Sequence, residues 1–172
     1  NRTLLVNGVS KSHAMTGWRV GYGASNENLI NAMNTIQSQS TSNACSISQY
    51  ATIAALEGSQ DFIHKNKLIY QKRRDLMLKI LSVSNRIKVP KPMGSFYALP
   101  SIKNLIGKST PKKKLINSDG DFVFELLNTT GVAVVPGSAF GVDNTFRISY
   151  AAPDNLIKEG CRLIANFANS LQ

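Results

Sequence analysis

The segment 7–22, NGVSKSHAMTGWRVGY, holds the residues of this chain whose types and spacing best suit chemistry. Lys11 lies among glycine, serine and alanine residues, and no acidic residue precedes Glu27. A lysine amine that has lost its proton is a nucleophile for carbonyl groups. Ser10 adds a hydroxyl donor and Arg19 a guanidinium, and together they suit an anionic cofactor such as a phosphate ester. The alternative interpretation is a surface lysine in a turn and an arginine that anchors a strand.

Two strands and two helices are expected to position this segment. Short apolar runs predict strands at 3–7 and 19–24, with a loop of small and polar residues between them. Ser25 is predicted to cap a helix over 26–37, where apolar residues recur at helical spacing. An alanine-rich stretch predicts a second helix over 46–56, which a glycine ends.

A long amphipathic helix is predicted over 62–81. Its apolar residues form two neighbouring rows, each stepping by 7, 7 and 4 positions, which gives the helix one buried face. The rows are Phe62, Ile69, Leu76 and Ile80, and Ile63, Tyr70, Met77 and Leu81. Because this helix separates the elements before it from those after it, we expect a boundary between two lobes near residue 70.

The second half of the chain is predicted to alternate strands and helices. The pattern favours strands at 95–99, 132–135 and 146–150, the second of them buried, and a helix at 121–128. In the strand 146–150, apolar residues alternate with Arg147 and Ser149, which places Arg147 on the face opposite the apolar one. A last helix, with Pro153 in its first turn, extends to about Leu171. This mixed order predicts an α/β fold.

The net charge of +10 is concentrated in one stretch of the sequence. Residues 62–114 hold 14 of the 20 lysines and arginines against a single acid, Asp75. A basic block of this kind can bind nucleic acid. A solvated helix face followed by a lysine loop at 112–114 explains it more simply, and no zinc-finger or RNA-binding motif accompanies it. We therefore expect no nucleic-acid partner.

Cysteine and apolar content exclude two further classes of protein. Cys45 and Cys161 are far apart and form no CxxC motif, so we predict no disulfide and interpret both as small core residues. The histidines are not spaced as metal ligands beside them, so no metal site is predicted. No apolar run approaches the roughly 20 residues that span a bilayer, so we expect no membrane partner and a cytoplasmic location.

Four motifs, in order along the chain, resemble the signatures of one enzyme family. They are SKSHAMTGWRVGY at 10–22, PMGSFY at 92–97, GVAVVPGSAF at 131–140 and FRISYA at 146–151. They resemble those of class I aminotransferases of the aspartate aminotransferase family, which are fold-type I enzymes dependent on pyridoxal 5'-phosphate (PLP). The resemblance runs nearly end to end, and it corresponds to the C-terminal part of the family's chain.

The resemblance implies a role for four residues. Lys11 aligns with the family lysine that bonds covalently to PLP and then moves a proton between the substrate and the cofactor. Arg19 aligns with the arginine that pairs with the cofactor phosphate, and Ser10 with a hydroxyl that donates to the same phosphate. Arg147 aligns with the arginine that binds the substrate α-carboxylate. The alternative for Arg147 is a strand arginine that faces solvent.

The resemblance also implies that this chain is one part of a longer enzyme. The family's other cofactor-binding groups lie upstream of the lysine, and only ten residues precede Lys11 here. We therefore expect 1–70 to be the end of the large PLP-binding domain and 71–172 to be the small C-terminal domain, joined by the helix 62–81. This portion by itself is expected to be inactive, and the complete protein is expected to be a homodimer.

The substrate and two other functions stay open at this point. The MTGW wording at 15–18 is common in the aspartate branch, so aspartate and 2-oxoglutarate are the preferred amino acid and 2-oxo acid. Another fold-type I enzyme, such as an aromatic aminotransferase or a carbon–sulfur lyase, shares Lys11 and Arg19. The third hypothesis is a basic binding module built on 62–114, without enzymatic activity.

Overall fold

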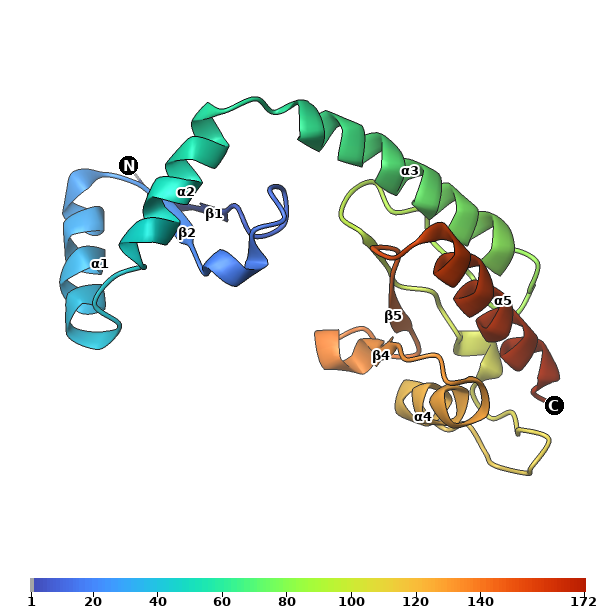
Figure 1. The fold of residues 1–172 in the computed structure, drawn as a ribbon. Coiled ribbons are helices and arrows are strands. Elements are labelled where there is room, and N and C mark those ends of the chain that lie inside the picture. Colours follow the sequence, from blue (N-terminus) through green and yellow to red (C-terminus); the bar gives the residue numbers. More distant parts are fainter. Residues whose placement is uncertain (1) are drawn as a thin grey trace. The chain divides into compact units, whose positions relative to one another are not determined.

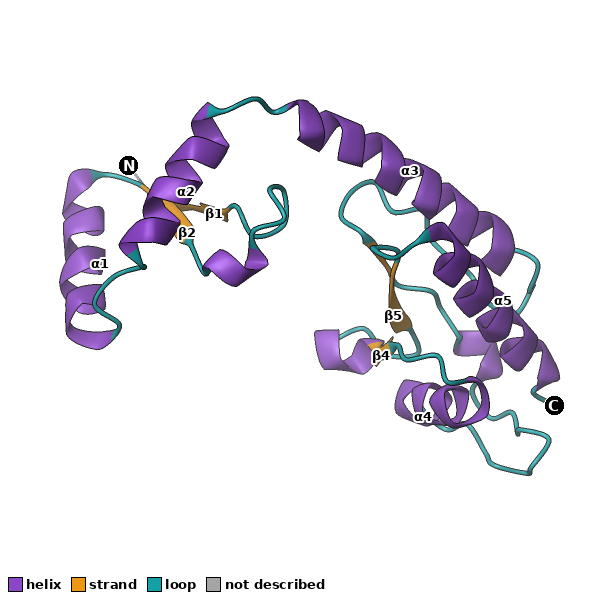
Figure 2. Cartoon of the chain, in the orientation of Figure 1, coloured by secondary structure: helices purple, strands orange, loops and turns teal. Residues whose placement is uncertain are grey.

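The computed structural model describes residues 2–172, and the chain divides into two units inside its longest helix (Figure 1). Unit 1 is Asn1–Asn66 and unit 2 is Lys67–Gln172. Each unit has its own small antiparallel sheet with helices around it, as Figure 2 shows by colour. Within the described part of the chain, no helix combines the length and the apolar character that crossing a membrane requires.

Unit 1 begins with a hairpin of two strands, β1 (Leu5–Gly8) and β2 (Gly21–Ala24). They pair in antiparallel register from Leu5 opposite Ala24 to Gly8 opposite Gly21. The two glycines permit a close approach, because an added Cβ on Gly8 would lie 3.3 Å from the Val20 carbonyl oxygen. Both strands were predicted, but the second begins later than expected. Arg19 has a left-handed backbone with φ of 54°, which ends any extended run before Gly21.

Two helices follow, α1 (Glu27–Ser40) and α2 (Ser46–Glu57). The prediction that Ser25 caps α1 is wrong. Asn26 is the cap, and its side-chain oxygen accepts from the Leu29 amide at 3.0 Å, whereas Ser25 Oγ donates to the Thr3 carbonyl at 2.8 Å. Serine and asparagine are both good N-cap residues. Ser25 does not cap the helix because its hydroxyl donates to the Thr3 carbonyl, just before β1.

The third helix, α3 (Asp61–Leu81), runs from unit 1 into unit 2. Only part of the predicted apolar face is covered. Met77 and Leu81 are fully buried, while Phe62 and Ile69 remain 38% and 44% exposed. The face is buried where the core of unit 2 packs against it.

Unit 2 contains a three-stranded antiparallel sheet in the order β3 (Tyr97–Ala98), β5 (Phe146–Ser149) and β4 (Val135–Pro136). β3 is shorter than the predicted strand 95–99, because Ser95 has φ of 66° and its carbonyl accepts from the Tyr150 hydroxyl at 3.0 Å. The predicted buried strand 132–135 is also wrong. Val132 and Val134 are half-buried and Ala133 is exposed, and strand pairing starts only at Val135.

Two helices complete unit 2, α4 (Asp119–Thr130) and α5 (Asp154–Ser170). α5 lies beside α3 and runs in the same direction, since Arg73 pairs with Asp154 near one end and Ser84 Oγ donates to Asn169 Oδ1 near the other (Figure 1). Pro153 is the residue before α5 rather than part of its first turn. Short 3-10 helices occur at Thr16–Trp18, Lys103–Leu105 and Gly137–Phe140.

The core of unit 2 joins both long helices to the sheet and α4. Phe122 of α4 lies at its centre, with ring centroids 5.4 Å from those of both Phe146 and Phe167. Cys161 is buried here, as predicted. The same prediction is wrong for Cys45, which is exposed and occupies the position before α2, where no apolar layer covers it.

Candidate functional site

The connection between β1 and β2 carries three of the four predicted site residues. Val9 and Val20, at its two ends, are 1% and 9% exposed and fix it to unit 1. Lys11 lies two residues after Val9 and is exposed, while Ser10 is half-buried. Within this turn the His13 amide donates to the Val9 carbonyl at 3.1 Å, and the Ala14 amide donates to the Lys11 carbonyl at 3.3 Å.

Arg19 lies at the far end of the same connection. Its Nη1 donates to the Thr16 carbonyl at 3.0 Å, so the side chain turns back over the 3-10 turn Thr16–Trp18. Neither Lys11 nor Arg19 forms an ion pair with a carboxylate of residues 2–172. Two cations and a serine hydroxyl on one anchored connection are the donors that an anionic ligand requires.

Arg147, the fourth predicted residue, lies in unit 2 on the central strand β5. Its Cζ is 4.5 Å from the ring centroid of Tyr97 and 4.4 Å from that of Phe140. Contacts of this kind hold a guanidinium by cation–π attraction and leave N–H donors at its edges. Arg147 is half-buried and makes no ion pair within the part of the chain described. Such a group is suited to a planar carboxylate.

The two aromatic rings reach Arg147 from separate elements. Tyr97 belongs to β3, where it pairs with Ser149 of β5. Phe140 ends the 3-10 turn Gly137–Phe140, and the buried Asp119 carboxylate fixes this turn by accepting from the Ser138 amide at 2.7 Å. Neither ring was assigned a role from the sequence. Both lie in the motifs 92–97 and 131–140, and this was the only signal that could have found them.

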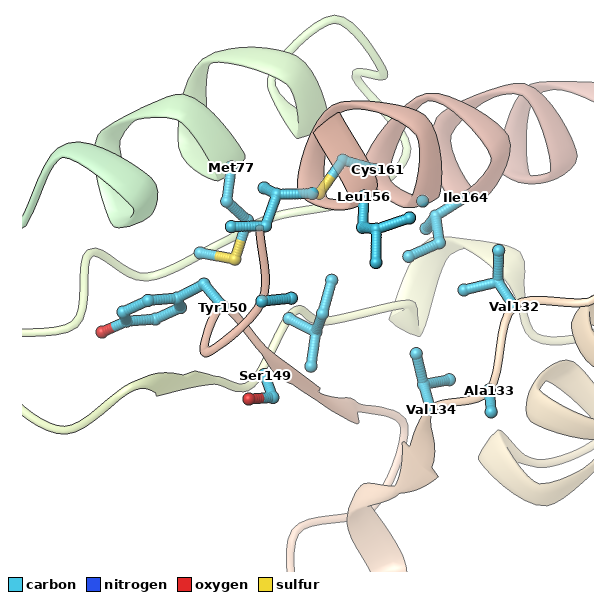
Figure 3. Close-up of a pocket in the computed structure, with 13 residues that line it drawn as sticks. Met77, Val132, Ala133, Val134, Ser149, Tyr150, Leu156, Cys161 and Ile164 are labelled. Atoms are coloured by element: carbon cyan, nitrogen blue, oxygen red, sulfur yellow. The ribbon is translucent and has the colours of Figure 1, made fainter. Parts of the chain in front are cut away.

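A pocket in unit 2 is a different feature. It has a volume of about 160 Å³ and is lined mostly by apolar side chains, with Met77, Val134 and Cys161 around it in Figure 3. Ile148, the neighbour of Arg147 on β5, also lines it. Burial raises the pKa of the Cys161 thiol to about 12, so the thiol stays protonated at neutral pH. With no charged side chain in its wall, this pocket does not suit a charged substrate.

The structure therefore brings Ser10, Lys11 and Arg19 onto one connection of unit 1 and sets Arg147 in unit 2. Among residues 2–172, no group of three or more histidine, cysteine, aspartate or glutamate side chains is arranged to hold a metal ion.

Comparison with known proteins gives a consistent result over the whole chain. The family model "Aminotransferase class I and II" matches residues 1–164. A probable aspartate/prephenate aminotransferase of Rhizobium leguminosarum bv. phaseoli is 53% identical over 170 residues, which is 99% of this chain and 42% of that protein. The aspartate/prephenate aminotransferase of Cereibacter sphaeroides is 49% identical over 171 residues, 99% of this chain and 43% of that protein.

The fold is also that of a solved aminotransferase. The crystal structure of the aspartate aminotransferase from Rhizobium meliloti superposes with a TM-score of 0.95 at 46% identity, covering 100% of this chain and 43% of that one. The predicted α/β fold is confirmed by this match, which corresponds to the C-terminal part of a fold-type I enzyme. The chain spans about two fifths of the length of the relatives that it matches.

Proposed function

This chain belongs to the aminotransferase class I and II family, and from that premise we propose that the complete protein is a PLP-dependent aminotransferase. It moves an amino group between an amino acid, with aspartate preferred, and a 2-oxo acid such as 2-oxoglutarate. The relatives named above add prephenate, which is itself a 2-oxo acid, as a candidate acceptor. The working form proposed is a cytoplasmic homodimer, in which unit 1 contributes to the cofactor domain and unit 2 is the small domain.

The arrangement of Lys11 carries this proposal. Its amine is exposed on a connection anchored by the buried Val9 and Val20, and no carboxylate of residues 2–172 pairs with it. An amine presented in this way can react with an aldehyde. Arg19 and Ser10, on the same connection, are the cation and hydroxyl that a phosphate monoester needs. The donor set of the connection therefore fits pyridoxal phosphate, which combines an aldehyde and a phosphate.

When bound, PLP supplies an electron sink for the bond that breaks at the α-carbon of the amino acid. The work of this chain is then to hold the phosphate with Arg19 and Ser10 and to move one proton with Lys11. The Lys11 Nζ would carry one proton from the substrate α-carbon to the cofactor carbon that was the aldehyde, first as a general base and then as a general acid. One amine suits both steps because it stands beside the reacting carbon throughout.

Arg147 is proposed to hold the α-carboxylate of the substrate. Its guanidinium offers two parallel N–H donors to the two carboxylate oxygens. The rings of Tyr97 and Phe140, at 4.5 and 4.4 Å from Cζ, limit its movement before the substrate arrives. A donor fork that is already oriented loses less conformational freedom when the substrate binds.

The test of this proposal is Lys11→Ala in the complete, PLP-supplemented protein. Because the alanine removes both the nucleophile and the proton carrier, transamination of aspartate is expected to fall by at least about a thousandfold. Lys11 is exposed and makes no side-chain hydrogen bond within residues 2–172, so the melting temperature of the protein prepared without PLP is expected to stay within about 1 °C. Near-native turnover of the variant would refute the assignment of Lys11.

A second measurement separates the alternatives. If the protein releases sulfide or eliminates a thiol from a sulfur amino acid faster than it transaminates aspartate, the carbon–sulfur lyase is favoured. If tyrosine or phenylalanine exceeds aspartate in kcat/KM, the aromatic aminotransferase is favoured.

A further inference from the structure

His13, two residues after Lys11, is joined to the junction between α2 and α3. Its Nε2 lies 3.1 Å from Gln60 Oε1, and its Nδ1 lies 2.8 Å from Ser12 Oγ. The imidazole ring also meets the Phe62 ring edge-on, with centroids 5.6 Å apart. All of these residues belong to unit 1. The side chain of His13 therefore links the turn that carries Lys11 to a distant segment of the sequence.

The orientation of the Gln60 amide decides which way the hydrogen bond runs. Gln60 Nε2 donates to the carbonyl of Ala55 at 2.9 Å and to that of Gly58 at 2.8 Å. With its donors committed to carbonyls, the amide presents Oε1 to the histidine as an acceptor. The His13 Nε2–H is therefore the donor. In the neutral imidazole, Nδ1 is then left to accept the Ser12 hydroxyl.

This link gives the lysine turn an anchor on each side. Val9, two residues before Lys11, is buried and its carbonyl accepts from the His13 amide. His13, two residues after Lys11, is held by its own side chain to Gln60. Val20 is the next buried residue of the connection after Val9. Without the His13–Gln60 hydrogen bond, the residues between these two valines would therefore lack this second anchor.

We propose that His13 and Gln60 are positioning residues, which hold the backbone at 11–13 so that the Lys11 amine is presented in one place. The effect on Lys11 chemistry rests on the proposed function, whereas the anchoring of the backbone at 11–13 does not. Gln60 can hold His13 because its own amide is fixed: its Nε2 donates to the Ala55 and Gly58 carbonyls at the end of α2. Since α3 begins at the next residue, Asp61, the hydrogen bond to His13 connects the lysine turn to the start of α3.

Two substitutions of His13 separate its hydrogen bond from its ring. His13→Phe keeps an aromatic ring beside Phe62 and removes the donor to Gln60. His13→Gln removes the ring and keeps an amide N–H that reaches the same acceptor. Gln60→Leu removes the acceptor from the other end. His64→Phe, at an exposed histidine of α3 with no side-chain hydrogen bond in the described chain, is the matched control.

The first measurement is backbone amide exchange in the complete protein prepared without cofactor. In His13→Phe and in Gln60→Leu, the His13 and Ala14 amides are expected to exchange about three- to tenfold faster, which is the effect of losing one ordinary hydrogen bond. His13→Gln and His64→Phe are expected to exchange as the parent does. Unchanged exchange in both donor and acceptor variants would overturn the proposal, and so would equal increases in His13→Phe and His13→Gln.

The second measurement is steady-state transamination by the PLP-loaded protein. His13→Phe is expected to lower kcat about three- to tenfold with little change in KM for the amino acid, because the proposed carboxylate site is at Arg147. An unchanged kcat beside faster exchange would overturn the link to Lys11. Exchange that behaves as expected in a protein without transaminase activity would support the anchoring of the turn and overturn the proposed function.

Discussion

Unit 2 buries a continuous apolar core, whereas unit 1 buries very little. In the described part of unit 1, the buried side chains are those of Val9, Val20, Ser48 and Thr52. Unit 2 buries seventeen apolar side chains that form one cluster. Large apolar residues in unit 1 stay exposed instead, including Val6 at 72%, Ile36 at 71% and Tyr50 at 75%. Apolar burial is the main source of folding free energy, so the two units are expected to differ in stability.

The two candidate sites differ in their support, because Lys11 lies in unit 1 and Arg147 lies in unit 2. Arg147 lies on the central strand of a sheet that the core supports, and two rings hold its guanidinium. Lys11 lies on a connection that is held by two buried valines and the His13–Gln60 hydrogen bond. Within this chain, the two candidate sites thus lie on supports that bury different amounts of apolar surface.

The largest expected effect compares one residue type in the two units. Ile164→Ala in α5 removes a fully buried side chain and is expected to lower the free energy of unfolding by about 2–5 kcal/mol. Ile36→Ala in α1 removes a side chain that is 71% exposed, and a change within about 0.5 kcal/mol is expected. Denaturant unfolding of the chain measures both. Similar losses from the two variants would contradict the comparison.

The next effect concerns a glycine that holds the Phe140 turn in place. A Cβ on Gly137 would overlap Thr145 Oγ1 and lie 2.5 Å from the Val142 carbonyl oxygen. Gly137→Ala is therefore expected to destabilise unit 2 by about 1–3 kcal/mol. Gly160→Ala in α5, where nothing lies within 4 Å of the added Cβ, is the control and is expected to stabilise by about 0.5–1 kcal/mol. Thermal unfolding distinguishes the two, and a Gly137→Ala variant as stable as the parent would show that the turn can shift freely.

A smaller effect is expected from changing the proposed carboxylate site of unit 2. Arg147→Lys in the complete protein replaces a two-point donor with a single ammonium, and KM for aspartate is expected to rise about 10- to 100-fold, as for the loss of one charged hydrogen bond. PLP binding is expected to be unchanged, because the cofactor residues proposed lie in unit 1. Arg162→Lys, at an exposed arginine paired with Glu159, is the control. If KM in Arg147→Lys stays at the parent's value, Arg147 is only a strand residue.

The smallest effect compares the two thiols, one in each unit. The backbone N–H groups of Ser48 and Ile47 lower the pKa of the exposed Cys45, while burial raises that of Cys161 to about 12. A lower pKa gives more thiolate at a given pH, and thiolate is the form that reacts with iodoacetamide. At pH 7.5, Cys45 is therefore expected to be alkylated at least about tenfold faster than Cys161 in the folded chain. Peptide mass spectrometry follows both rates, and labelling of Cys161 as fast as that of Cys45 would contradict this expectation.

Helices were predicted well because their signals are local. The ranges 26–37, 46–56 and 62–81 lie within two or three residues of α1, α2 and α3 at each end. Strands were predicted less well, since strand length depends on a partner that is distant in sequence. The run 132–135 has the composition of a buried strand, yet only Val135 of that run pairs with β5. The apolar pattern of these residues could not reveal how far the neighbouring strand extends.

The sequence by itself determined which residues are proposed to carry chemistry and where the first three helices lie. The motifs of fixed spacing contain Lys11, Arg19 and Arg147. Helices are predictable because their apolar periodicity can be recognised within a short stretch of sequence. Only the tertiary structure decided what holds these residues: the rings of Tyr97 and Phe140 around Arg147, and Gln60 beside the turn of Lys11. Those contacts join residues that are distant along the chain. Their formation depends on how the sheet and helices pack, which no local pattern encodes.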